Sequence, residues 1–413
     1  MKIRYITTCM LLSILPWAAH ATTLEQAMNM VKEKHPKLAM SALDNDAARA
    51  QLSSQSSYAF NPELSLEYQD RKLNGGGNSA DYYIGISQGI ELGGKGGYRQ
   101  EAAQAALQQS KDNTEVLRQQ LSIAVARAYV ELSLAKQTLD VRIQQSQALK
   151  ALSVGVKRQL DVGDANILDA NLAQSAYITA LSAETNARQV YALVQARYQN
   201  ALGQQAISDD TGFALPQLQP DWQIPENPLA IAKSSRAEMS ALKAKVRQFQ
   251  AKSELADANR FSDPTISLMK GREAGEDLIK LGVSFALPLT NTRKGTYQAS
   301  LAQAMRSQNE LAWFEQRLAL DVQAAVFNHA YAMQALKEAH HMAQSMNADN
   351  NVKLAKAAFD AGELSLEALV IHINQALEAR LTRLNIIKQG WLARIQLAQT
   401  LGHPEYILQG IQS

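Results

Sequence analysis

Cysteine is almost missing from this chain of 413 residues, in which Cys9 is the only one. One cysteine cannot form an intrachain disulfide or a cysteine-based zinc site, so a disulfide framework and a redox role are excluded. A surplus of positive charge is missing too, because 41 Lys and Arg stand against 39 Asp and Glu. Binding to phosphate backbones needs such a surplus, so we expect no nucleic-acid partner.

Long hydrophobic runs are missing after residue 21, where no stretch approaches the ~18 to 20 apolar residues of a transmembrane helix. Residues 1–21 have the features of a secretory signal, with two basic residues, an apolar run over 10–17 and the small-x-small site Ala19-His20-Ala21. We therefore expect export and a mature chain that begins near Thr22. An exported chain of this kind that enters a membrane must do so with β-strands.

Catalytic and cofactor-binding patterns are missing as well. No nucleophile, base and orienting group occur at a recognisable spacing, so we predict no enzyme and no cofactor. The run from Gly89 to Lys95 has the spacing of a phosphate-binding loop, but Gly96 stands where a magnesium-binding Ser or Thr is needed. We interpret these glycines as a backbone bend where a strand becomes a helix.

Histidine and methionine crowd one segment but do not predict a metal site. The residues are His329, Met333, His340, His341, Met342 and Met346. His329 and Met346 fall on a helix-packing seam, and adjacent residues such as His340 and His341 point about 100° apart on a helix. We favour packing and solvent exposure for this group and predict no bound metal.

What the chain does contain is an internal repeat, with two units about 199 residues apart. Five segments recur in the same order, namely 40–43 as 239–242, 61–66 as 263–268, 85–87 as 282–284, 160–164 as 359–363, and 201–203 as 400–402. A Pro-rich linker over 215–228 separates the units, because its prolines forbid a continuing helix. We predict a first repeat over 22–214, a second over 229–402 and a C-terminal tail over 403–413.

Each repeat is predicted to run helix, β-hairpin, long helix, long helix, beginning in the first repeat with a helix over 24–58. Alternating apolar and polar residues predict hairpins over 62–91 and 263–289. Apolar residues at steps of four and three, starting at Leu121 and again at Leu318, predict helices that pack side by side. The long helices are expected over 97–160, 164–202, 295–359 and 363–401.

The predicted fold class is therefore mainly α with a small β part. Helices of about 60 residues would run roughly 90 Å, which excludes a compact globule. Four strands per chain cannot close a membrane barrel, because closed barrels begin at about eight strands. Three copies would supply about twelve strands. The alternative is a small soluble sheet at the end of a helical bundle.

Two features of each repeat resemble the TolC family of outer-membrane efflux factors. They are the helix-to-strand junctions Asn61-Pro62 and Asp263-Pro264, and the turn glycines Gly163 and Gly362. Together with the duplicated plan, they extend the resemblance over nearly the whole mature chain.

A shorter run resembles one branch of that family. Residues 88–95, read with Arg99, are similar to the strand-to-helix signature of the cobalt-zinc-cadmium efflux branch. Gly96-Gly97 departs from that branch, which more often has a basic or bulky residue after the lysine.

The resemblance implies a homotrimer, with a twelve-stranded β-barrel in outer-membrane lipid and an α-barrel of long antiparallel coiled-coil helices in the periplasm. A periplasmic adaptor protein would join it to an inner-membrane resistance-nodulation-division pump. The expected function is a passive exit duct for divalent heavy-metal cations. One alternative is the same duct serving drug efflux or type I protein secretion, and another is a periplasmic coiled-coil scaffold.

Acidic residues gather at the two glycine turns, namely Asp161, Asp164, Asp360 and Glu363. Threefold symmetry would convert an inward-facing acid into a ring of carboxylates, which attracts cations and favours an openable constriction. The alternative role is helix capping. The turns also resemble the family's adaptor-docking tip, whose candidate residues here are Arg158, Leu160, Val162, Gly163, Lys356, Phe359, Ala361 and Gly362.

Overall fold

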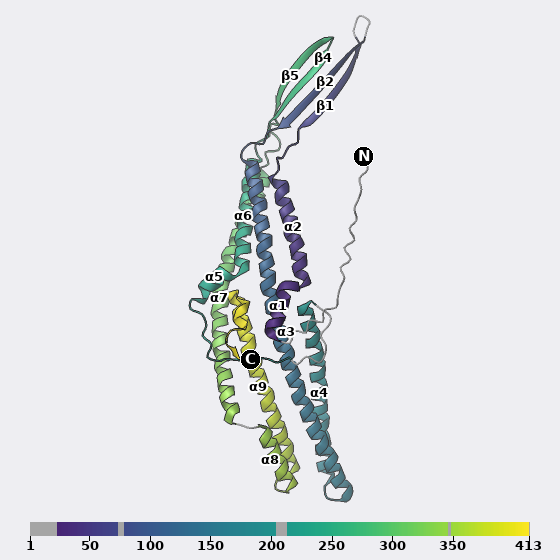
Figure 1. Cartoon of the computed structure of the whole chain (residues 1–413), viewed down its shortest axis with the longest axis vertical. Helices are drawn as coiled ribbons and strands as arrows, with labels where there is room; N and C mark the ends of the chain where they lie inside the picture. Colours follow the sequence, from purple (N-terminus) through teal and green to yellow (C-terminus); the bar gives the residue numbers. More distant parts are fainter. Residues whose placement is uncertain (1–22, 73–77, 204–212, 346–347, 413) are drawn as a thin grey trace.

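The two repeats build one elongated molecule, with a β-sheet at one end and two helical turns at the other (Figure 1). The computed structural model describes residues 23–72, 78–203, 213–345 and 348–412. The predicted signal segment, 1–21, lies outside the described residues. Within them the predicted fold class, mainly α with a small β part, is confirmed.

The elements follow the same order in both repeats. The first contains α1 (Leu24–Lys34), α2 (Pro36–Ser56), β1 (Glu63–Lys72), β2 (Asn78–Gly89), α3 (Lys95–Val162) and α4 (Ile167–Leu202). The second contains α5 (Pro228–Ser235), α6 (Ala237–Ala258), β4 (Thr265–Glu273), β5 (Glu276–Ser284), α7 (Lys294–Ser345), α8 (Ala348–Asp360) and α9 (Leu366–Leu401). The linker strand β3 (Gln217–Leu218) pairs with β6 (Ile411–Gln412), which follows the 3-10 helix η1 (Pro404–Ile407).

The predicted first helix, 24–58, is two helices that meet at His35. This residue precedes Pro36 and takes an extended conformation, with φ −68° and ψ 131°. The proline ring disfavours the helical conformation in the residue before it, which ends α1. The ring Nδ1 of His35 then accepts a hydrogen bond from the amide of Lys37 and caps α2.

The predicted hairpin 263–289 is shorter than expected. Strand β5 ends at Ser284, which pairs with Thr265, the first residue of β4. Pro264 precedes Thr265 and has no N–H to donate to a sheet, so the following part of the chain finds no partner strand here. In the predicted long helix 295–359, residues 346 and 347 between α7 and α8 lie outside the described residues.

One antiparallel sheet joins the hairpins of the two repeats in the order β1-β2-β4-β5. The joint is the pairing of β2 with β4, in which Ile86 lies opposite Leu268. One face of the sheet carries exposed apolar side chains, namely Leu64, Leu66, Tyr68, Tyr82, Ile84, Ile86, Ile266, Leu268, Ile279, Leu281 and Val283. Serine and glycine occupy alternate positions, such as Ser65 opposite Gly85. The alternation gives the sheet one apolar face and one mixed face, which carries small residues together with polar and charged ones such as Glu67, Tyr83 and Lys280.

Helix α3 is the longest described element, with 68 residues and therefore a length of roughly 100 Å. It packs against α1, α2, α4, α6 and α9, so elements of both repeats lie on it. Its buried side chains include the predicted seam residues Leu121 and Val125. In the largest core cluster, Tyr129, Tyr198 and Phe213 pack edge to face. Among the described helices, none has the length and apolar content that crossing a bilayer requires.

Candidate functional site at the two helical turns

The two glycine turns have the same backbone geometry. Gly163 follows α3 with φ 86°, and Gly362 follows α8 with φ 77°. The Gly163 amide donates to the carbonyl of Leu160, and the amide of the next residue reaches back five positions. The hydrogen bonds around Gly362 repeat this pattern. This arrangement satisfies the last carbonyls of a helix and needs a left-handed residue, which explains glycine at both positions.

Helix capping falls to residues other than the predicted acids. The side chain of Asn166 accepts a hydrogen bond from the amide of Asp169, and Ser365 does the same for Ala368. Helices α4 and α9 therefore begin at 167 and 366, not at the predicted 164 and 363. Asp164 and Glu363 lie before these caps, so the capping role considered for them is wrong.

The four predicted acids are exposed at one end of the molecule. Asp161, Asp164, Asp360 and Glu363 have no hydrogen bond or ion pair through their side chains with any described residue. Figure 1 shows the two turns that carry them side by side at the end opposite the sheet. This end of the molecule therefore carries exposed carboxylates that no described residue neutralises.

The predicted docking residues divide into exposed and half-buried groups. The exposed residues are Arg158, Val162, Gly163, Lys356, Ala361 and Gly362, and the half-buried ones are Leu160 and Phe359. Phe359 packs against the core that includes Leu369 and Leu377. The second turn is therefore anchored by an aromatic ring, whereas glycine and charged side chains remain free for contact.

Sequence reasoning missed an apolar patch beside the first turn. Ile167 and Leu168 are exposed next to Val162, with Leu168 at 74%. Their counterparts in the second repeat are Leu366, which is buried, and Glu367. The available signal was two adjacent apolar residues directly after the cap Asn166. Successive residues point in different directions on a helix, so a helix that is covered on one side can bury only one of the two.

The glycine run before α3 is a structural joint between the repeats. The Lys95 ammonium is buried and lies 2.8 Å from Asp263 of the second repeat, and it also donates to the carbonyl of Phe261. Gly93 and Gly94 both have positive φ, so the predicted backbone bend is present. A lysine engaged in this way is unavailable to a phosphate, which agrees with the structural interpretation of this run.

The histidine and methionine segment also has a structural explanation. His329 is 1% exposed and packs edge to face against Trp222, at 5.6 Å between ring centres. Burial, and secondarily the charge of Arg394, lowers the pKa of His329 to about 4. Among the described residues, no group of three or more His, Cys, Asp or Glu side chains is placed to hold a metal ion. Met346 lies outside those residues.

Two sequence comparisons relate the chain to efflux proteins. The family model described as outer membrane efflux protein matches residues 27–204. The cobalt-zinc-cadmium resistance protein CzcC of Cupriavidus metallidurans is 25% identical over 93% of this chain and 91% of its own length. The outer membrane protein TolC of Vibrio cholerae is 24% identical over 95% of this chain and 93% of its own length.

A comparison of structures supports the fold. A crystal structure of CusC, described in terms of folding and transmembrane channel formation, superposes with a TM-score of 0.71. It covers 92% of both chains at 17% identity. This coverage supports a shared fold over most of the chain.

The buried His329 predicts a pH dependence of stability. Its pKa is about 4 in the folded chain against an ordinary 6.5, so below pH 6.5 the unfolded chain binds a proton that the folded chain does not. The free energy of unfolding should fall by about 3 kcal/mol as the pH drops from about 6.5 to 4. His329→Gln should remove this part of the loss, measured as the unfolding temperature at pH 7 and pH 4.5. The control is His341→Gln, at an exposed position; equal pH dependence of both variants and the unmodified chain would contradict the prediction.

Proposed function

We propose that three copies of this chain form the passive exit duct of a tripartite efflux system. The premise is that the chain belongs to the outer membrane efflux protein family and is an outer-membrane protein that extends into the periplasm. The single observation that carries the proposal is the unclosed sheet. Its apolar face is exposed on all four strands, and the outer strands β1 and β5 each have only one partner among the described residues.

Closure of the sheet explains why the copies must assemble. An apolar face suits the hydrocarbon of a bilayer, but an unpaired strand edge there leaves backbone N–H and C=O groups unsatisfied. Three copies placed edge to edge would pair β5 of one with β1 of the next and close a barrel of about twelve strands. The small residues on the opposite face, such as Ser65 and Ser267, would then line its lumen.

A second unfinished surface lies on α2. The motif Met-Ser-Ala-Leu occurs on α2 at 40–43 and on α6 at 239–242. Met40 is nevertheless 65% exposed, whereas Met239 is 2% exposed. The difference arises because α6 packs against both α3 and α7, whereas α2 packs mainly against α3. By the symmetry of the repeat, the missing neighbour of α2 is α7 of another copy.

Helix α7 carries an exposed surface that fits this role. Trp313 is 59% exposed, and Met305 is exposed two turns before it. The wall of the groove that α3 forms against α6 includes Ala105, Gln108 and Asp112. The corresponding positions 197 residues later are Ala302, Met305 and Asn309, which line an open groove on α7. That groove has one wall in a single copy, and α2 of another copy would supply the second.

Charges distinguish the groove within a chain from the groove between copies. Within the chain, Asp112 of α3 and Lys243 of α6 line the same groove. Between copies, Asp44 stands in the place of Lys243, and Arg306 lies in the open groove of α7. On the side of α3 that α6 occupies, Asp44 would face Asp112 and be repelled, whereas on α7 it would face Arg306 and the neutral Asn309. Helix α2 therefore suits the open groove of α7 better than the groove that α6 fills on α3.

The helical turns are proposed as the end that meets the adaptor and the pump. The exposed apolar patch of Val162, Ile167 and Leu168 supports protein contact, because such residues gain from burial. The unpaired acids Asp164 and Glu363 would approach their copies around the threefold axis. Their mutual repulsion supports a constriction that opens and that attracts cations.

Divalent heavy-metal cations are the proposed cargo. Support comes from the similarity to CzcC, whose name records resistance to cobalt, zinc and cadmium, and from the acidic turns. The pump partner that fits this cargo is of the resistance-nodulation-division class. Drugs or a secreted protein are the second candidate cargo. The chain is 25% identical to CzcC and 24% identical to TolC, so sequence identity alone does not favour the metal-resistance protein as the better guide to cargo.

Deleting the gene tests the cargo. We expect a deletion strain to stop growing at several-fold lower zinc, cobalt or cadmium than its parent, with higher cell metal content, because the exit duct is missing. Complementation should restore growth, and a drug panel serves as the comparison. Sensitivity to drugs without sensitivity to metals would contradict the proposed cargo and leave the duct in place.

Replacing the turn glycines tests the docking role. In Gly163→Leu and Gly362→Leu the added side chain meets open space, so only the local turn is strained, by about 1–2 kcal/mol. We expect loss of complementation with normal amounts of trimer in the outer membrane. Gly155→Leu, at an exposed helical position with open space, should complement fully. Loss of folded trimer in the turn variants would show that these glycines serve folding instead.

Cross-linking tests the contact between copies. The mature chain has no cysteine of its own, so Leu43→Cys on α2 and Met305→Cys on α7 would be the only thiols. A flexible bismaleimide should join the double variant into dimers and trimers on a denaturing gel. Each single variant should stay monomeric. If both thiols of the double variant are fully alkylated and no cross-link forms, this contact between copies is excluded.

A further inference from the structure

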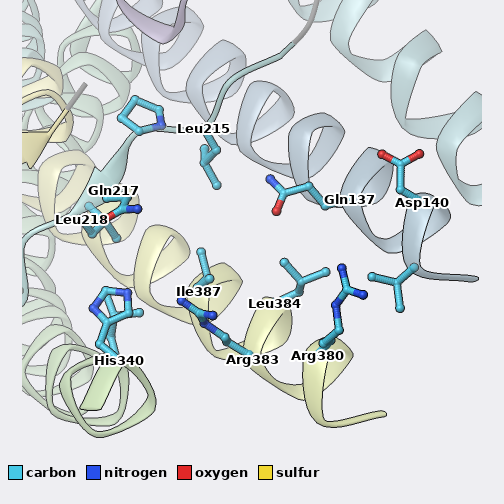
Figure 2. Close-up of a pocket in the computed structure, with 13 residues that line it drawn as sticks. Gln137, Asp140, Leu215, Gln217, Leu218, His340, Arg380, Arg383, Leu384 and Ile387 are labelled. Carbon is cyan, nitrogen blue, oxygen red and sulfur yellow. The ribbon is translucent and has the colours of Figure 1, made fainter. Parts of the chain in front are cut away.

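A cavity of about 460 Å³ lies where α3, α7, α9 and the linker strand β3 meet (Figure 2). It is distant in sequence from the helical turns and the sheet, and the proposed duct function does not use it. Its size falls within the range of small-molecule sites, which is roughly 300–1,000 Å³. Its four walls come from both repeats and from the linker between them.

Much of the lining is aliphatic. The residues are Val141 from α3, Leu215 and Leu218 from the linker, Leu336 from α7, and Leu384 and Ile387 from α9. Leu336 and Leu218 are almost fully buried, and they also pack near Gly390. Leu215, Leu384 and Ile387 are partly buried and pack against the same core, so the apolar wall is part of the packed structure.

The charged side chains of the cavity are mostly basic. Arg380 and Arg383 come from α9 and His340 from α7, and Figure 2 shows Arg383 and His340 on the same side of the cavity. The sole acid in the lining, Asp140, already accepts a hydrogen bond from Lys136 at 2.9 Å. The cavity therefore carries net positive charge.

Of the two arginines that line this cavity, Arg383 is the exposed one. Arg380 donates to Gln144 at 2.8 Å, whereas Arg383 has no hydrogen bond or ion pair with any described residue. Burial, and secondarily the charge of Arg383, holds the pKa of His340 below its ordinary value. His340 is thus favoured in its neutral form, which adds a hydrogen-bonding group without a second competing charge.

We propose that this cavity binds a single-chain amphiphile with an anionic head group, such as a carboxylate or a phosphate. The head would pair with Arg383 and reach His340, and the chain would lie on Leu215, Leu384 and Ile387. A free inorganic anion would leave the apolar wall in contact with water, and a neutral lipid would gain nothing from the positive charge of Arg380 and Arg383. An amphiphile satisfies both parts of the lining at once.

Protection of a single thiol tests the site on the full chain. Ile387→Cys would place the only thiol of the mature chain inside the cavity, and Leu168→Cys would place it at the first helical turn. The rate of alkylation by N-ethylmaleimide is measured with octanoate, octyl phosphate, octanol and octyltrimethylammonium. Because both thiols are in the same detergent, Leu168→Cys reports any effect of the probe on the micelle alone.

We expect octanoate and octyl phosphate to slow alkylation of Ile387→Cys severalfold, with little effect from octanol and none from the cation. Stronger protection by octanoate than by octyl phosphate would identify a fatty-acid type of ligand, and the reverse a phosphate-headed one. Adding Arg383→Gln should weaken octanoate binding severalfold, since a charge pair with an exposed arginine is lost. Arg188→Gln removes an exposed cation on α4 and should change nothing.

Three results would overturn the proposal. They are equal protection by all four probes, unchanged octanoate binding in the Arg383→Gln variant, and a thiol at 387 that stays unreactive without any probe. The last would mean that another copy or the chain itself closes the cavity. Unfolding temperatures of both arginine variants are compared with the parent, so that a loss of protection is separated from a loss of folding. Failure here leaves the proposed duct intact, because cross-linking and growth report on that separately.

Discussion

The packing of both repeats on α3 is the constraint on which the rest of this structure depends. A helix of 68 residues cannot bury its own apolar stripe, and helices in proteins gain most of their stability from packing that stripe against other elements. Helices α1, α2 and α4 of the first repeat cover part of the stripe, and α6 and α9 of the second repeat cover the remainder. The repeats therefore cannot separate without exposing α3. The buried pair of Lys95 and Asp263 joins the same two repeats at the end next to the sheet.

Function in this molecule follows from what a single copy leaves unfinished. The four-stranded sheet has two edges, and Met40 on α2 is exposed where the equivalent Met239 is buried. Both features have the same origin. Within one chain each repeat has a neighbouring repeat on one side and none on the other, so its outer side stays uncovered. A closed ring of copies covers every such side at once. The proposed duct is an assembly that meets this requirement of the duplicated architecture.

Much of the fold could be predicted from local patterns, and much of the candidate site could not. Alternation in the hairpins and steps of four and three in the helices are set by backbone geometry, so the sequence shows them directly. Gly163 and Gly362 were recognisable because a left-handed turn requires glycine. The caps at Asn166 and Ser365, and the exposure of Leu168, were missed because they depend on where a helix starts by one or two residues and on which neighbour covers it.

The sequence by itself determined the repeat, the alternation of the strands and the mainly helical class, because each is written in spacings of two to seven residues or in one long offset. Only the tertiary structure decided that Lys95 meets Asp263, that His329 is buried against Trp222, and that Arg383 and Leu215 line the same basic cavity. These groups lie more than a hundred residues apart in the chain. Packing of the two repeats and of the linker between them brings these groups together, and no local periodicity encodes those contacts.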